Sequence, residues 1–284
     1  MGLATTAGLT ACSDSSDSSG KPTVVASTNV WGSVAAQIAG QDADIESIIN
    51  SPTEDPHEYQ TTPSDAAHIR DASLVIVNGG DYDEFAEQAA DGRDKPTINA
   101  VDTRKGTGAE DDENEHVWYD VNTVGAVADK IAHELGGADP AHAQAYTDRA
   151  AAFRGQLTKI NDITARIAAE HPKSPVLQTE PIGHYLLQAA GATDRTPHAF
   201  AEAVEQGTDP APADVATVRE LVHAKQIRAV IYNKQTEGKT TADVADTARK
   251  TGVPVVEVTE TLPEGTDYVR WQTGNAQALA DALN

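Results

Sequence analysis

Short apolar runs rich in β-branched residues alternate along this chain with longer segments in which apolar residues recur every three or four positions. The short runs predict buried strands, and the longer segments predict helices that cover them. In the first half the expected strands are 23–28, 45–49, 73–77 and 97–101, and the expected helices are 30–39, 63–71, 82–90 and 121–135. Because strands alternate with helices, we expect a mostly parallel sheet with both faces covered.

The same rhythm returns after residue 171 and predicts a second sheet. The expected strands are 175–179, 228–232 and 254–259, and the expected helices are 182–190, 213–224, 240–251 and 275–283. Gly252 follows the third of these helices, where glycine commonly ends a helix because it tolerates the left-handed conformation. The chain of 284 residues is long for one domain, so we expect two lobes of ordinary size.

A helical segment of unusual length separates the two halves. Asp139 can cap this helix, Pro140 suits its first turn, and Pro172 ends it. One apolar stripe follows helical spacing between them and comprises Tyr146, Ala150, Phe153, Leu157, Ile160, Ile163 and Ile167. About 32 residues at about 1.5 Å each give a rod about 48 Å long. We therefore expect a rigid helix that braces both lobes and restricts hinge closure, rather than a flexible linker.

The only cysteine, Cys12, has neighbours that indicate a function for it. Leu9, Thr10 and Ala11 precede it, an order that resembles a bacterial lipobox, in which the signal peptide is cut before the cysteine and the thiol receives a lipid. The polar segment 13–20 is typical of a flexible tether and argues against a free core cysteine. The basic and apolar regions of a signal peptide are missing or short here, so we expect the true start upstream.

These patterns divide the chain into four expected parts. Residues 1–22 are a signal remnant, lipobox and flexible tether, 23–137 the N-terminal lobe, 138–171 the linking helix, and 172–284 the C-terminal lobe. The lipid would hold the protein to the outer face of the cell membrane, so we expect an extracytoplasmic location.

Charge and hydropathy exclude some partners. The formal net charge of -23 would repel a phosphate backbone, so no nucleic acid is expected as a partner. No stretch of the sequence approaches the roughly 20 apolar residues of a membrane span. Acidity suits a protein that concentrates cations, but it also suits any soluble surface protein, so the charge alone does not decide the function.

Residue types that bind metals follow the carboxyl ends of several predicted strands, where open α/β sheets bind ligands. His57 lies in the segment Asp-Pro-His-Glu-Tyr after the second strand, and His116 lies beyond an acidic loop after the fourth. Glu180 and Glu260 come at the ends of two strands in the second half. These two imidazoles and two carboxylates predict a four-ligand set across an interlobe cleft. Such donors suit Zn²⁺, Mn²⁺ and Fe²⁺, and the absence of thiolate argues against Cu(I) or a cysteine-type zinc site.

Several segments together resemble the zinc/manganese-binding proteins of ABC importers, the family often called cluster A-I. These segments are 55–59, the acidic loop leading into 116–120, the long central helix, 179–181 and 258–263, and the resemblance covers essentially residues 23–284. It implies an α/β fold of two Rossmann-like lobes with parallel sheets, joined by a long rigid helix, with the metal site in the interlobe cleft. It also implies that His57, His116, Glu180 and Glu260 are the metal ligands.

The function that this resemblance implies is the capture of one divalent transition-metal ion, Zn²⁺ or Mn²⁺, as cargo, followed by delivery to an ABC permease and its ATPase. We expect a monomer without enzymatic activity. We also expect Asp120, Asn233 and Gln235 to support the ligands from behind by contacting them rather than the ion.

Two departures from zinc-specific members of the family concern the identity of the metal. Those members often carry a histidine-rich loop before the second histidine, where this chain has the acidic segment 108–115, and often have histidine where this chain has Glu180. Both departures favour Mn²⁺, whereas at equal geometry a site of nitrogen and oxygen donors binds Zn²⁺ more tightly. The acidic loop 109–115 is either a solvated charge run or a weak collector of cations.

Two other functions compete with metal import. A metal-dependent surface adhesin would be favoured if no ATPase or permease gene were adjacent. A metallohydrolase needs an open metal position for water, whereas four protein ligands fill the shell here. The dipeptide His133-Glu134 is also not followed by the second histidine of an HExxH motif.

Overall fold

The computed structural model describes residues 20–52, 54–106 and 114–284, and it confirms an α/β fold with two parallel sheets. The sheet of the N-terminal lobe has the order β2-β1-β3-β4. Its strands are β1 (Thr23–Thr28), β2 (Asp44–Ile49), β3 (Leu74–Val77) and β4 (Thr97–Asn99). Every residue of β3 is buried, as expected for a central strand covered on both faces.

The second sheet repeats this arrangement in the C-terminal lobe, with the order β6-β5-β7-β8. Its strands are β5 (Pro175–Gln178), β6 (Thr193–Asp194), β7 (Ala229–Asn233) and β8 (Val255–Val258). β6 was not expected, because an exposed strand of two residues has no apolar alternation that a sequence could display.

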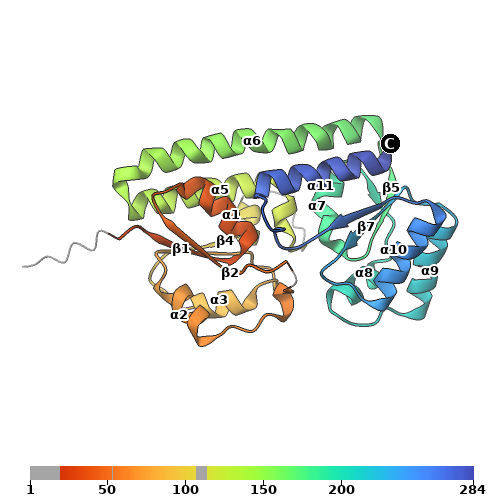
Figure 1. Cartoon of the computed structure of the whole chain (residues 1–284), viewed down its shortest axis with the longest axis horizontal. Helices are drawn as coiled ribbons and strands as arrows, with labels where there is room; N and C mark the ends of the chain where they lie inside the picture. The colour runs from red at the N-terminus through yellow and green to blue at the C-terminus, as the bar shows by residue number, and fades with distance from the viewer. Residues whose placement is uncertain (1–19, 53, 107–113) are drawn as a thin grey trace, which may run out of the picture.

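Helices cover both faces of each sheet (Figure 1). In the N-terminal lobe they are α1 (Asn29–Ala39), α2 (Pro63–Asp71), α3 (Glu84–Ala90), α4 (Ala100–Gly106) and α5 (Val121–Ala138). In the C-terminal lobe they are α7 (His184–Ala189), α8 (His198–Glu205), α9 (Pro212–His223), α10 (Lys239–Thr251) and α11 (Tyr268–Leu283). Gly252 ends α10 with φ 77°, the left-handed conformation predicted for it.

Two of these helices were missed, and one is longer than predicted. The predicted strand 97–101 gives way to α4 at Ala100, because the Asn99 side chain accepts a hydrogen bond from the Asp102 amide and starts a helix there. α8 follows Pro197 in a segment to which the sequence assigned no element. α11 starts at Tyr268 rather than 275, where Asp267 caps it by accepting from the Arg270 amide at 2.9 Å.

The long helix α6 (Ala143–Glu170) runs along both lobes, with α5 beneath its first half and α11 beneath its second (Figure 1). Its 28 residues span about 42 Å at about 1.5 Å each. All seven residues of the predicted apolar stripe are buried, so the periodicity identified the packed face correctly. The helix begins later than the expected 139, because Asp139 has a non-helical backbone with φ −135° and ψ 78° and a separate 3₁₀ turn, Pro140–His142, follows it.

One apolar core continues through both lobes. It includes Val24 of β1, Tyr146 and Ile167 at the two ends of α6, Ile231 of β7 and Leu283 of α11. Two smaller cores lie on the other faces of the sheets. The lobes therefore share a packed interior along α6 instead of meeting only at a hinge.

The strand ends of the two lobes are also tied to each other by hydrogen bonds. The Asn29 side chain donates to the Leu262 carbonyl at 3.0 Å and accepts from the Leu262 amide at 2.8 Å. The Tyr119 hydroxyl donates to the Thr259 carbonyl, and the Tyr268 hydroxyl donates to the Trp118 carbonyl. These bonds fix how the carboxyl edges of the two sheets face each other. In the described part of the chain, none of the helices has the length and apolar character needed to cross a membrane.

Candidate metal centre

His57 lies in a short 3₁₀ turn, Pro56–Glu58, directly beyond β2 and the loop that follows it. Asp55 caps this turn by accepting a hydrogen bond from the His57 amide at 3.0 Å. The imidazole packs edge-on against the ring of Tyr82, with 5.0 Å between the ring centroids. These contacts hold His57 in place: Asp55 and Pro56 fix the turn, and the ring of Tyr82 fixes the orientation of the imidazole.

His116 is almost completely buried and precedes the 3₁₀ turn Val117–Tyr119. Asn114 accepts from the His116 amide at 3.0 Å, and its side-chain oxygen also lies 3.3 Å from Nδ1 of the ring. A proton on Nδ1 satisfies that contact and leaves the lone pair on Nε2 for a cation. The ring packs against Trp118 at 5.1 Å, which holds its plane in place.

Glu180 and Glu260 approach the same position from β5 and β8, and one amide group joins them. The Asn233 side chain donates to Oε1 of Glu180 and, at 2.8 Å, to Oε1 of Glu260. The Thr236 hydroxyl donates to the other oxygen of Glu180 at 2.7 Å. Both glutamates are fully buried, so their carboxylates face the interior between the lobes.

The other residues expected to support the ligands have different roles. Gln235 accepts from the amides of Glu260 and Thr261 at 2.6 and 3.0 Å and so holds the Glu260 backbone. Asp120 instead caps α5 by accepting from the Asn122 amide, and it pairs with Arg104 at 3.2 Å. Its hydrogen bonds in the described part of the chain therefore hold the start of a helix.

Donor atoms from distant parts of the chain converge around His57. One donor atom each of Asp55, His57 and Glu260 lie within 4.8 Å of one another, and so do those of His57, Glu115 and His116. Glu180 joins this arrangement through the amide of Asn233 that it shares with Glu260. The four residues predicted as ligands thus lie in one region, and their binding to an ion stays a prediction.

Burial sets the charge of these groups in the absence of a cation. It lowers the pKa of His57 and takes the pKa of His116 well below 6.5, so both rings are neutral donors at neutral pH. Burial raises the pKa of Glu180 to about 7 and that of Glu260 well above 4.5, the latter also through repulsion by Glu180. A bound divalent cation would provide the opposite charge that stabilises the ionised form of both carboxyl groups.

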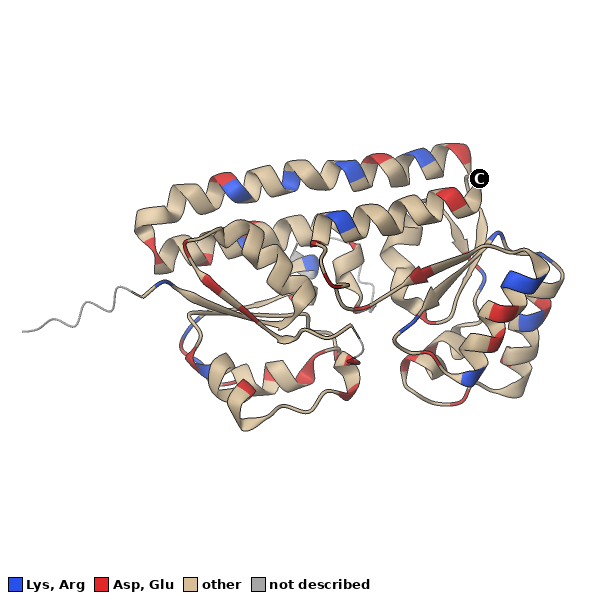
Figure 2. Ribbon diagram, in the orientation of Figure 1, with Lys and Arg blue, Asp and Glu red and all other residues tan. Residues whose placement is uncertain are grey.

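The site opens into a cavity of about 1710 Å³ between the lobes. Eight carboxylates line it, including Asp55 and Glu115 from the N-terminal lobe and Glu205 from α8, whereas its described lining contains no lysine or arginine. Figure 2 shows acidic residues on the edges of both lobes that face each other. The cleft therefore attracts cations and repels anions.

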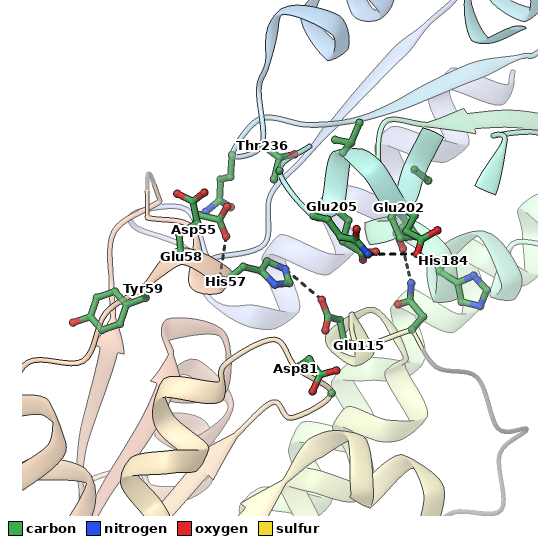
Figure 3. Close-up of a pocket in the computed structure, with 18 of the residues that line it drawn as sticks. Asp55, His57, Glu58, Tyr59, Asp81, Glu115, His184, Glu202, Glu205 and Thr236 are labelled. Atoms are coloured by element: carbon green, nitrogen blue, oxygen red, sulfur yellow. Dashed lines mark hydrogen bonds and ion pairs between the residues drawn. The ribbon is translucent and has the colours of Figure 1, made fainter. Parts of the chain in front are cut away.

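Sequence reasoning missed several polar residues of this cleft. Glu115 was counted only as the end of the acidic loop, which was left open as a solvated charge run or a weak collector of cations, but it is buried beside His57 (Figure 3). Glu205 lies on α8, a helix that was not expected, and approaches His116 to 3.8 Å. Asp55 belongs to a motif that was recognised, so its proximity to His57 was a usable signal. Cys12 and residues 107–113 of the acidic loop lie outside the described residues.

Known proteins resemble this chain along almost its whole length. The pattern of the family described as "Zinc-uptake complex component A periplasmic" matches residues 24–282. The manganese ABC transporter substrate-binding lipoprotein PsaA of Streptococcus pneumoniae is 22% identical over 301 residues, covering 98% of this chain and 94% of that protein.

Solved structures share the fold. The periplasmic zinc-binding protein TroA of Treponema pallidum superposes with a TM-score of 0.78 at 20% identity, covering 93% of this chain and 99% of that one. The laminin-binding protein Lmb of Streptococcus agalactiae, described as bifunctional with adhesin and metal-transporting activity, gives a TM-score of 0.76 at 20% identity, covering 93% of this chain and 100% of that one.

Proposed function

Because the chain belongs to the family described as zinc-uptake complex component A, periplasmic, we propose that it captures a divalent transition metal, Zn²⁺ or Mn²⁺, outside the membrane and delivers it to an ABC permease. The metal is cargo, and the chain is a binding protein rather than an enzyme. The proposed ligands are His57, His116, Glu180 and Glu260.

The observation that carries this proposal is the convergence of neutral imidazoles from one lobe and buried carboxylates from the other. Glu260 brings a donor atom within 4.8 Å of one on His57, although 203 residues separate them in the chain numbering. Asn233 orients both glutamates, as partners of metal ligands commonly do. Two carboxylates would neutralise the charge of one divalent ion, which lowers the cost of burying the loaded site.

Calorimetric titration of the chelator-stripped protein with Mn²⁺ and with Zn²⁺ tests the proposal. We expect one tightly bound ion per chain and a melting temperature that rises on loading, because the ion binds only the folded state. The variant His57→Ala should lose most of this affinity. A stripped, folded protein that binds neither ion would contradict the proposed function.

The identity of the metal follows from competition between the two ions. Oxygen donors at two of four positions suit Mn²⁺, but Zn²⁺ lies higher in the general order of affinities. Competition titrations measure which metal the site prefers. The metal content after purification in the absence of chelators shows which metal the cell supplies.

The finer proposals concern the membrane and the partners. Cys12 would carry a lipid, as the lipobox pattern indicates, and relatives such as PsaA are named lipoproteins. The protein would act as a monomer on the outer face of the cell membrane, together with a permease and its ATPase. Replacing Cys12 with alanine should move the protein from the membrane fraction to the medium or periplasm. Unchanged fractionation would contradict the lipid anchor.

Surface adhesion is the second candidate function, because the structural neighbour Lmb is described as an adhesin as well as a metal transporter. The two functions make different predictions for a strain that lacks the gene. If the strain loses metal uptake and added Mn²⁺ or Zn²⁺ restores it, the result supports import. If the strain loses adherence and added metal does not restore it, the result supports adhesion.

A further inference from the structure

Glu115 is a buried acidic side chain next to the proposed ligands. It directly precedes His116, and its carboxylate lies 3.3 Å from Nε2 of His57 (Figure 3). Its side chain is only 11% exposed and that of His57 is 22% exposed, so this contact lies largely inside the protein. The position of Glu115 is fixed through its backbone, because its carbonyl accepts a hydrogen bond from the buried side chain of Asn78 at 2.8 Å.

The donors of Glu115, His57 and His116 form a compact group. One donor atom from each residue lies within 4.8 Å of the other two, a spacing that one ion can bridge. Two imidazoles and one carboxylate are a donor set that divalent Zn, Mn and Fe accept. All three residues come from the N-terminal lobe, since His57 follows β2 and the other two follow α4.

Two members of this group, His57 and Glu115, lie nearer the solvent than the donors from the C-terminal lobe, whereas His116 is as deeply buried as Glu180. His57 and Glu115 line the cavity, whereas Glu180 and Glu260 have relative exposures of 1% and 0%. An ion that enters from the cleft therefore meets the His57–Glu115 pair before it reaches the two deeper glutamates. His57 also belongs to the group with Asp55 and Glu260, so it is common to both sets of donors.

We propose that Glu115 is a fifth metal-binding side chain, which with His57 and His116 forms a three-donor entry site carried by the N-terminal lobe alone. The cation binds there first and then moves toward Glu260 and Glu180, with His57 as the ligand shared by both positions. This inference rests on the proposed function, because it concerns the same ion and the same cleft.

The first test is calorimetric titration of Glu115→Gln with Mn²⁺. The substitution keeps the shape of the side chain and replaces a carboxyl group, which can bind a cation as carboxylate, with an amide that cannot ionise. We expect affinity to fall at least about tenfold, the lower limit found even for residues that only support metal ligands. Glu58→Gln is the matched control, since it makes the same replacement in an exposed residue next to His57 that lines the same cavity. Equal losses in both variants would assign the effect to general charge and overturn the proposal.

The second test removes the deeper carboxylates and asks whether the entry site persists. The variant Glu180→Gln/Glu260→Gln should still bind one Mn²⁺ with reduced affinity, and adding Glu115→Gln should abolish that binding. Circular dichroism establishes that each variant is folded. If the double variant binds no ion, or the triple variant binds as well as the double, no separate entry site exists.

These outcomes are distinct from a failure of the proposed function. A wild-type protein that binds no divalent metal would overturn both ideas. A wild-type protein that binds one ion tightly, while Glu115→Gln matches it, would overturn only the entry site and leave the capture of the metal unaffected.

Discussion

Asn233 shows how a single residue can hold two proposed ligands, Glu180 and Glu260, in place. Its amide nitrogen carries two hydrogens, and it donates one to Glu180 and one to Glu260. Two buried carboxylates repel each other, and a shared donor holds them side by side before an ion arrives. The cost of ordering the ligands is thereby met during folding rather than during binding.

Replacing Asn233 with alanine should lower Mn²⁺ affinity by about tenfold to a hundredfold, the range typical for residues that orient metal ligands. Titration calorimetry measures the change. Asn275→Ala is the control, because Asn275 is another buried amide whose partners are Tyr119 and Gln272. A similar loss of affinity in both variants would show that the effect comes from lost buried hydrogen bonds in general.

The residues of the site differ in how far the sequence reveals them. His57 and Glu180 stand in short motifs at strand ends, so their types and positions were sufficient to predict their convergence. Glu115 ends a run of acidic residues, and such runs are usually solvated. Its burial depends on the packing of residues far away in the chain, including Asn78. No local sequence pattern predicts the contact between Asn78 and Glu115.

At the scale of elements, two features set the direction of the long helix α6. They are the turn between α5 and α6 and a set of hydrogen bonds made by Arg149 close to that turn. Arg149 of α6 donates to the carbonyls of Ile38 and Ala39 at the end of α1, at 2.6 and 2.9 Å. It also pairs with Asp42 at 2.8 Å. A cation at the carboxyl end of a helix meets unpaired carbonyls and a favourable dipole, so this residue ties α6 to the N-terminal lobe.

The variant Arg149→Ala should destabilise the protein by about 2 kcal/mol, because hydrogen bonds from a charged donor are worth more than neutral ones and the Ile38 carbonyl loses the donor that Arg149 supplies. Urea denaturation measures this loss. Arg154→Ala removes an exposed pair with Asp129 on the same helix and should cost less than about 1 kcal/mol. Equal costs for the two variants would contradict a clamping role for Arg149.

The turn itself contains a histidine whose charge depends on pH. A hydrogen bond to Asp139 at 2.6 Å raises the pKa of His142, and Asp42 adds to this, while Arg149 opposes it. A raised histidine pKa stabilises the folded state below the usual value of 6.5, and this contribution disappears as pH rises through the folded-state pKa. His142→Ala should therefore destabilise the protein more at pH 5 than at pH 9, as measured by urea denaturation. An effect of the same size at both pH values would contradict this prediction.

At the scale of the whole molecule, α6 joins the lobes through packing. The apolar core that includes β1 and β7 also includes the stripe of α6, so one face of each sheet shares a continuous interior with the other lobe, while a smaller core of its own covers the opposite face. A cleft between lobes fixed in this way can change by small local movements more readily than by wide closure.

The shared core predicts that both lobes unfold in one transition. Trp31 lies in α1 and Trp271 in α11, so variants that retain only one of the three tryptophans, either Trp31 or Trp271, report on each lobe separately. The free energies of unfolding reported by the two variants should rise equally when metal is added, by about 2.7 kcal/mol at a free metal concentration of about a hundred times Kd. A shift confined to one fluorescent reporter would indicate that the lobes unfold independently.

The sequence by itself determined the local structure and the residue types of the site. The alternation of strands and helices, the stripe of α6 and the left-handed Gly252 all follow from short-range periodicity and backbone preference, and each was predicted correctly. The family resemblance added the capture of the metal as cargo and its delivery to an ABC permease.

Tertiary structure alone decided which groups share a buried space. It brought α8 and Glu205 to the cleft and placed Glu115 against His57. Burial and charge in such a space arise from contacts between segments far apart in the chain. The periodicity of a sequence indicates only which face of each element is apolar. It does not predict which distant side chains meet, and this is decided when the elements pack together.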